Sequence, residues 1–185
     1  MKKSTLNSSR RFFLKKSAAA SSFFIIPRFV LGGNGYTAPS DRLSIASIGC
    51  GGKGSSDIAH ASVNGRENVV ALCDIHPNGG HGVVDSRKRF PKARFYTDFR
   101  ELINEEKGLD AVTISTPDHT HGIIAKTAME NNIHVYVQKP LTHNIKEARL
   151  LTELARNKKI VTQMGNQGAS HPGQKYVQQW ILDKR

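Results

Sequence analysis

Short apolar runs alternate with helical stretches six times between Asp41 and Gly165. The runs predicted as buried strands cover residues 43–49, 68–74, 93–98, 110–116, 133–140 and 160–165. Connections this short between successive strands allow only right-handed crossovers. The alternation therefore predicts an α/β fold, a doubly wound parallel sheet with helices on both faces.

Two of the expected helices carry N-cap signals. Asp98 is followed by Glu101 three residues later, and Asn144 is followed by Glu147 at the same spacing. An Asp or Asn side chain satisfies free backbone amides at the start of a helix, and an acid three residues on strengthens the signal. We therefore expect one helix to begin after Asp98 and another after Asn144.

A glycine-rich loop, GCGGKG at Gly49–Gly54, follows the first strand and opens the first helix, in the pattern G-x-G-x-x-G. The first glycine makes the tight turn, the second lets the backbone approach a pyrophosphate, and the third lets helix and strand pack closely. Asp74 lies 20 residues past Gly54, at the end of the second strand, and no arginine follows it immediately. Its carboxylate can accept hydrogen bonds from a ribose diol and would repel a 2′-phosphate. The pattern predicts a Rossmann dinucleotide-binding domain that prefers NAD over NADP; the alternative is a loop that merely turns.

Residues 1–40 differ from the rest in charge. They hold seven basic residues and no acidic one, in a chain with a formal net charge of +12. A cationic stretch (1–16) precedes a weakly hydrophobic one (17–31) and a polar one, which is the order of an export signal. The string SRRFFLK at Ser9–Lys15 matches the twin-arginine pattern S-R-R-x-F-L-K. We expect residues 1–40 to be a signal that the Tat translocon recognises, so that the protein is exported, for example to the periplasm. A disordered basic N-terminus is the alternative.

Composition excludes several other classes. Residues 41–185 hold 20 basic against 15 acidic residues, without a basic stripe interleaved with aromatic side chains, so nucleic-acid binding is not expected. No apolar run reaches the roughly 18–20 residues that span a bilayer. Cys50 and Cys73 cannot make a zinc site of the CxxC type; they are either buried free thiols or a pair across adjacent strand ends.

Four histidines invite a metal interpretation, but their spacing specifies no third ligand and H-x-H at a helix start points its side chains apart. No metal is therefore expected, and the four are interpreted as ordinary loop or cofactor-pocket histidines. These histidines are His76, His81, His119 and His121.

The segments STPDHTH (115–121) and VYVQKPLTHN (135–144) resemble the Gfo/Idh/MocA family of nicotinamide-dependent oxidoreductases, and the resemblance extends over residues 43–185. PRFVLGGNGYTAPSDRL, VQKPLTHNIKEARLL and TQMGNQG resemble its twin-arginine-exported bacterial branch. The resemblance implies a dinucleotide-binding domain at 41–165, and a connection at 166–185 to a substrate domain that is absent from this chain. It also implies hydride transfer on a sugar-like or polyol substrate, and a homo-oligomer in the full-length form.

The resemblance further implies site residues. Thr116 and Pro117 match a turn near the nicotinamide, and His121 matches a histidine in the following helix. Lys139 matches the lysine of the E-K-P motif. In the family this lysine contacts cofactor and substrate at the reacting carbon, so Lys139 is the expected catalytic residue. The residues expected to bind the cofactor are Gly49, Cys50, Gly51, Gly52, Lys53, Gly54, Asp74, Ser115, Thr116, Pro117, His121, Gln138 and Lys139.

The chain departs from the family pattern at two places. Gln138 replaces the glutamate of E-K-P, so a negative charge beside Lys139 is missing and the charged lysine should be less favoured. Gln138→Glu is therefore predicted to move the pH optimum. The chain also stops at Arg185, before the family's other catalytic groups, so we expect dinucleotide binding with little or no turnover.

One alternative is a non-catalytic dinucleotide- or sugar-binding protein with the same fold. A periplasmic solute-binding protein is a weaker one, because it would leave the glycine loop and Asp74 without a purpose.

Overall fold

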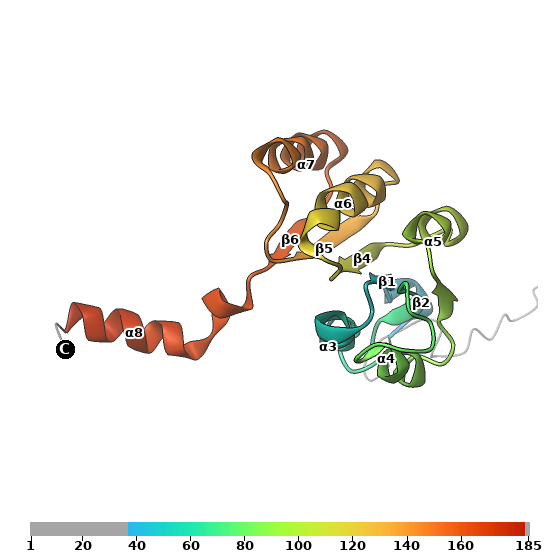
Figure 1. Ribbon diagram of the computed structural model, residues 1–185, viewed down its shortest axis with the longest axis horizontal. Helices are drawn as coiled ribbons and strands as arrows, with labels where there is room; N and C mark the ends of the chain where they lie inside the picture. Colours follow the sequence, from blue (N-terminus) through green and yellow to red (C-terminus); the bar gives the residue numbers. More distant parts are fainter. Residues whose placement is uncertain (1–36, 184–185) are drawn as a thin grey trace, which may run out of the picture. The chain divides into compact units, whose positions relative to one another are not determined.

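The computed structural model describes residues 37–183, in which six parallel strands form one sheet in the order β3-β2-β1-β4-β5-β6 (Figure 1). The strands are β1 (Ser44–Ile48), β2 (Asn68–Cys73), β3 (Arg94–Tyr96), β4 (Ala111–Ile114), β5 (His134–Gln138) and β6 (Thr162–Gly165). The winding direction reverses between β1 and β4, which confirms the predicted doubly wound sheet. Each strand ends up to two residues inside the apolar run that predicted it, because the flanking residues already belong to the connecting loops.

Helices lie on both faces of this sheet. The helices of the described residues are α3 (Gly52–Ala61), α4 (Val83–Arg89), α5 (Phe99–Glu105), α6 (His121–Glu130), α7 (Ile145–Lys158) and α8 (Pro172–Leu182), with 3-10 turns η1 (Pro39–Asp41), η2 (Asp118–Thr120) and η3 (Gln167–Ser170). Figure 1 shows α3 and α4 on one face and α5, α6 and α7 on the other. This division follows from right-handed crossovers that run first one way from β1 and then the other.

Helix α4 has no counterpart among the elements predicted from the sequence. It follows a segment dense in glycine and proline, begins after Gly82 at φ +88°, and is only seven residues long. A seven-residue helix has too few turns for an apolar period to be recognised, and the glycine and proline residues before it are typical of a loop.

Both predicted N-caps are confirmed. The Asp98 carboxylate accepts a hydrogen bond from the Arg100 amide at 2.8 Å, and the Asn144 side chain accepts one from the Glu147 amide at 2.9 Å. The Glu147 carboxylate accepts in turn from the His143 amide at 3.0 Å, one residue before the cap. The caps start α5 and α7 where the sequence indicated.

Two apolar cores hold the strands in place, one on each face. The larger core lies beneath α5–α7 and includes Ile48, Ile114 and Val137 from neighbouring strands. The smaller one, beneath α3 and α4, includes Ile45 and Leu72. Alternate residues of one strand point to opposite faces, so β1 serves both cores. The rigid centre of the sheet thereby fixes the loops that follow β1, β2 and β4.

The predicted export signal cannot be placed in this fold. Its twin-arginine string at Ser9–Lys15 lies outside the described residues. Within residues 37–183, no helix has the length and apolarity needed to cross a membrane.

Candidate functional site

A crevice of about 940 Å³ opens at the carboxyl ends of β1, β2 and β4. Its walls come from the glycine loop, from residues 73–76 and from the turn at residues 115–117. This is the point where the strand order reverses, which is where open α/β sheets bind ligands.

Backbone packing explains two glycines of the loop. Gly49 has φ +78°, and a Cβ there would lie 2.8 Å from the backbone of Ser115. A Cβ on Gly54 would lie 1.7 Å from the carbonyl oxygen of Gly49. The start of α3 therefore rests directly on the end of β1, which confirms the packing reason given for Gly54. The Gly51 amide donates to the Asp74 carboxylate, and the Gly52 amide donates to the His81 carbonyl oxygen.

Asp74 follows β2, lies beside the glycine loop in the lining of the crevice, and is half-buried. One carboxylate oxygen accepts a hydrogen bond from the Gly51 amide at 3.1 Å, and the other accepts from the His76 amide at 3.3 Å. A carboxylate has about four lone-pair sites, so two backbone donors orient it and leave acceptor capacity for a ligand.

The turn after β4 contributes Ser115, Thr116 and Pro117 to the crevice. The next predicted residue, His121, lies elsewhere: it is 1% exposed, with Nδ1 2.6 Å from the Pro140 carbonyl oxygen and Nε2 2.9 Å from that of Thr116. His121 therefore ties together the turns that follow β4 and β5. It does not line the crevice, and its contact with a cofactor stays a prediction.

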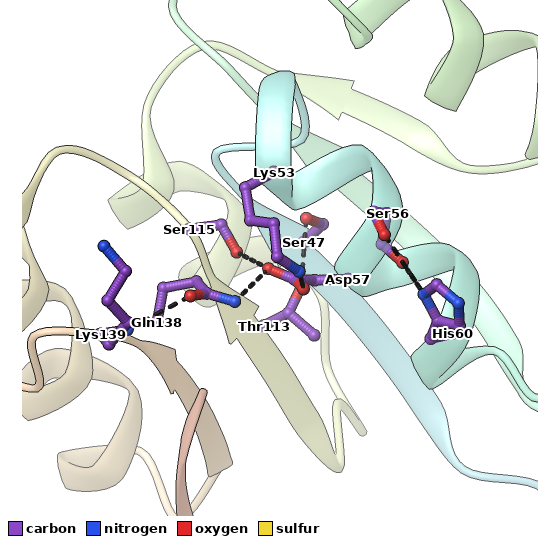
Figure 2. A network of polar contacts seen from close by, with 9 residues as sticks. All are labelled: Ser47, Lys53, Ser56, Asp57, His60, Thr113, Ser115, Gln138 and Lys139. Atoms are coloured by element: carbon purple, nitrogen blue, oxygen red, sulfur yellow. Dashed lines mark hydrogen bonds and ion pairs between the residues drawn. The ribbon is translucent and has the colours of Figure 1, made fainter. Parts of the chain in front are cut away.

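Gln138 and Lys139 end β5. Gln138 is buried and Lys139 is exposed, and neither belongs to the lining of the crevice. The peptide between Lys139 and Pro140 is cis. Lys53 of the glycine loop also points away from the crevice and forms an ion pair with Asp57 on α3 (Figure 2). The predicted roles of Gln138, Lys139 and Lys53 as cofactor contacts remain predictions.

Both cysteines are free and buried next to the crevice, and the Cys50 amide donates a hydrogen bond to the Cys73 carbonyl at 3.1 Å. Burial raises the pKa of each thiol to about 12, and the neighbouring Asp74 carboxylate adds to the effect. Such thiols stay protonated at neutral pH and behave as small apolar side chains.

Within residues 37–183, no three His, Cys, Asp or Glu side chains gather in a group that could hold a metal ion.

The sequence reasoning did not select several residues of the crevice. Ile75, Thr97 and Arg100 belong to its lining, as do His76 and His119, which the sequence left open as either loop or cofactor-pocket histidines. Each follows a strand end by a few residues, so the rule that ligands bind at the carboxyl ends of strands could have found them.

Residues 43–166 match the family model described as "Oxidoreductase family, NAD-binding Rossmann fold", GFO_IDH_MocA. The chain belongs to this family. It therefore carries the family's NAD-binding domain, and the predicted family resemblance is confirmed; membership of the twin-arginine-exported branch stays a prediction.

Curated relatives of the chain include dehydrogenases of polyols and nucleotide sugars. Inositol 2-dehydrogenase of Salmonella typhimurium is 30% identical over 126 residues, which are 66% of this chain and 36% of that protein. UDP-N-acetylglucosamine 3-dehydrogenase of Acidithiobacillus ferrooxidans is 35% identical over 71 residues, 38% of this chain and 23% of that protein. Glycosyl hydrolase family 109 proteins of Shewanella also match, and the matches to curated relatives of either kind span between 18% and 36% of the relatives' length.

Solved structures agree with the fold. GenD2 from gentamicin A biosynthesis, in complex with NAD, is 26% identical with a TM-score of 0.61, over 76% of this chain and 37% of that one. The WlbA dehydrogenase from Bordetella pertussis, in complex with NADH and UDP-GlcNAcA, is 18% identical with a TM-score of 0.65, over 78% of this chain and 44% of that one. The latter similarity is in the fold alone.

Proposed function

We propose that this chain is the NAD-binding part of an oxidoreductase that transfers a hydride between NAD and a hydroxyl-bearing carbon of a sugar-like or polyol substrate. The observation that carries the proposal is the Asp74 carboxylate, held by the Gly51 amide in a crevice that the glycine loop also lines. Relatives that act on inositol and on a nucleotide sugar support the substrate class.

The residues present fit such a cofactor. Gly49 and Gly54 allow the start of α3 to pack on the end of β1, so the positive end of this helix lies at the loop that lines the crevice, where it would favour a pyrophosphate. Asp74 keeps acceptor capacity for a ribose diol, and its charge disfavours the 2′-phosphate of NADP. When bound, NAD would supply the hydride acceptor or donor.

Lys139 is the residue that we propose to act on the substrate. Its Nζ would donate a hydrogen bond to the reacting oxygen and stabilise negative charge there. The side chain is exposed at the end of β5, on a turn that the buried Gln138 and His121 hold in place.

The substrate pocket is proposed to lie in a further domain of the whole protein. The chain spans about a third or less of the curated relatives that it matches. In this proposal residues 166–185 lead into that domain, which would hold the substrate and mediate any homo-oligomer.

Calorimetry with the purified chain tests the cofactor assignment. We expect NAD to bind and NADP to bind more weakly, and mass spectrometry of the native protein to reveal any NAD that copurifies. A correctly folded sample without affinity for NAD would overturn the proposal. In the whole protein, bound NAD without any change in nicotinamide absorbance across a panel of sugars and polyols would select the non-catalytic alternative.

We propose also that residues 1–40 direct export through the Tat translocon. This route carries folded proteins, so NAD would be loaded before export and would have to stay bound. A reporter fused to residues 1–40 should be exported, and changing Arg10 and Arg11 to lysine should stop it. Undiminished export of that variant would contradict the assignment.

A further inference from the structure

Asp57 is a buried carboxylate that the proposed function does not use. It lies in the second turn of α3 and is 7% exposed. Figure 2 shows that its oxygens receive side chains from three parts of the fold. Ser115, after β4, donates its hydroxyl at 2.8 Å; Gln138, at the end of β5, donates its amide nitrogen at 2.8 Å; and Lys53 forms the ion pair within α3.

The Gln138 carboxamide uses its two ends differently. Its Nε2 donates to Asp57, and its Oε1 accepts from the backbone amide of Lys139 at 3.3 Å. A Cβ on Gly165 would lie 2.8 Å from Nε2, so the neighbouring strand β6 confines the side chain on its other side. This position therefore requires a donor toward Asp57 and an acceptor toward Lys139.

An amide meets that requirement, whereas an ionised carboxylate offers acceptors only. A glutamate at this position would bring two carboxylates within hydrogen-bond distance, and one of them would have to take up a proton. The glutamine in place of the E-K-P glutamate therefore does not leave the region without an anion. A carboxylate lies one hydrogen bond away, on α3.

We propose that Asp57 is a positioning residue for the Gln138–Lys139–Pro140 turn and that it dictates the amide at position 138. Since Asp57 also pairs with Lys53, it joins the glycine loop to the turn that presents Lys139. Only the consequence for Lys139 rests on the proposed function; the pairing of positions 57 and 138 stands on the contacts themselves.

A charge-swap cycle on the whole chain tests the pairing. The four proteins are the parent, Asp57→Asn, Gln138→Glu and the double variant, and thermal unfolding is measured without cofactor at about pH 5 and about pH 8. We expect Gln138→Glu to lower the melting temperature by about 5–10 °C at the higher pH and by much less at the lower one. The reason is that the variant's folded state needs an extra proton, whose stabilising effect is lost as the pH rises.

The double variant is the rescue. The amide introduced at position 57 can donate to the carboxylate introduced at position 138, so this protein should recover at least half of the loss caused by Gln138→Glu at the higher pH. A loss that is equal at both pH values, or a double variant whose effect is the sum of the single ones, would overturn the pairing. If Gln138→Glu fails to fold at the higher pH, two measurements still test the pairing. They are the melting temperature of the double variant at the higher pH and that of Gln138→Glu at the lower pH.

Calorimetric titration of the four proteins with NAD separates this inference from the proposed function. If the cycle shows rescue but NAD does not bind the parent, the cofactor assignment fails and the pairing stands. If NAD binds but the stabilities are additive, the pairing fails and the cofactor assignment stands.

Discussion

Asp74 and Asp57 are two carboxylates on either side of the same glycine loop, and they are held in opposite ways. Asp74 is half-buried and rests on two backbone amides, from Gly51 and His76. Asp57 is buried and receives three side chains, which come from residues distant in sequence as well as from its own helix. The first keeps acceptor sites open toward the crevice, and the second has its acceptors engaged within the fold.

This difference separates a group for binding from a group for positioning. Backbone donors orient Asp74 without occupying all of its lone pairs, so a ligand can still be recognised. Side-chain donors on Asp57 tie α3 to the ends of β4 and β5, so that its removal would leave buried polar groups without partners. Four changes test this difference between the two carboxylates.

Among substitutions measured at neutral pH, Gly54→Ala should have the largest effect, because it disturbs both carboxylates by pushing α3 away from β1. The new Cβ would meet the Gly49 carbonyl oxygen at 1.7 Å. Because the clash is with backbone, we expect a cost at the upper end of the usual range for overpacking, about 3 kcal/mol. That loss lowers the melting temperature by roughly 10 °C. Gly79→Ala, where nothing lies within 4 Å of the new Cβ, is the matched control. Equal melting curves for the two variants would contradict the described packing.

Alkaline pH should lower the free energy of unfolding, because Cys50 and Cys73 are buried beside Asp74 and the glycine loop. Cys50 and Cys73 have pKa values of about 12 in the folded chain against an ordinary 9.0, so the unfolded chain loses their protons first. The protonated thiols contribute their full stabilisation below about pH 9, and this contribution is lost as the pH rises toward about 12. Near about pH 10.5 the free energy of unfolding should have fallen by roughly 2 kcal/mol per thiol. Denaturant unfolding against pH measures this slope.

The control for that slope is the double variant Cys50→Ala/Cys73→Ala, which should flatten it. Some slope should remain, because burial and the hydrogen bond to Glu106 also raise the pKa of Tyr96 to about 12. An unchanged slope would show that the thiols ionise as readily in the folded chain as in the unfolded one.

Asp74→Asn should reduce NAD affinity about 10- to 100-fold, since a charge-assisted hydrogen bond to a diol contributes roughly 1.5–3 kcal/mol. The melting temperature should fall by only about 3 °C, because the single asparagine oxygen can receive one of the two backbone amides while its NH2 group replaces the oxygen that faces the other. Preference over NADP should weaken in the same variant. Asp85→Asn, on the exposed surface of α4, should leave affinity unchanged.

Lys53→Ala should have the smallest effect. The lysine side chain is 48% exposed, so its ion pair with Asp57 contributes less than about 1 kcal/mol after solvent screening. Thermal unfolding should then resemble that of Lys126→Ala, which removes another i,i+4 pair on a helix. A much larger loss would mean that Asp57 depends on the ion pair rather than on Ser115 and Gln138.

The sequence predicted the side of the loop that holds Asp74 better than the side that holds Asp57. Asp74, Gly49 and Gly54 form a local pattern with fixed spacing, and each spacing has a backbone reason that the structure bears out for the glycines. The six strands and the caps at Asp98 and Asn144 were also readable, because apolar period and capping are local signals.

Long-range pairing was not readable. Asp57 and Gln138 are 81 residues apart, and nothing near either residue indicates the other. His121 was assigned to the cofactor site by resemblance alone, and nothing in the sequence indicated that it would be buried between the Thr116 and Pro140 carbonyls. His119, two residues earlier, lies in the crevice instead, since the 3-10 turn η2 sets which side chain faces it.

The hydrogen bond between Gln138 and Asp57 links what the two positions can carry. A domain with glutamate at position 138 and aspartate at position 57 would need an extra proton to stay folded, so it should lose stability as the pH rises. We therefore expect natural domains of this kind with glutamate at the first position to carry an uncharged side chain at the second.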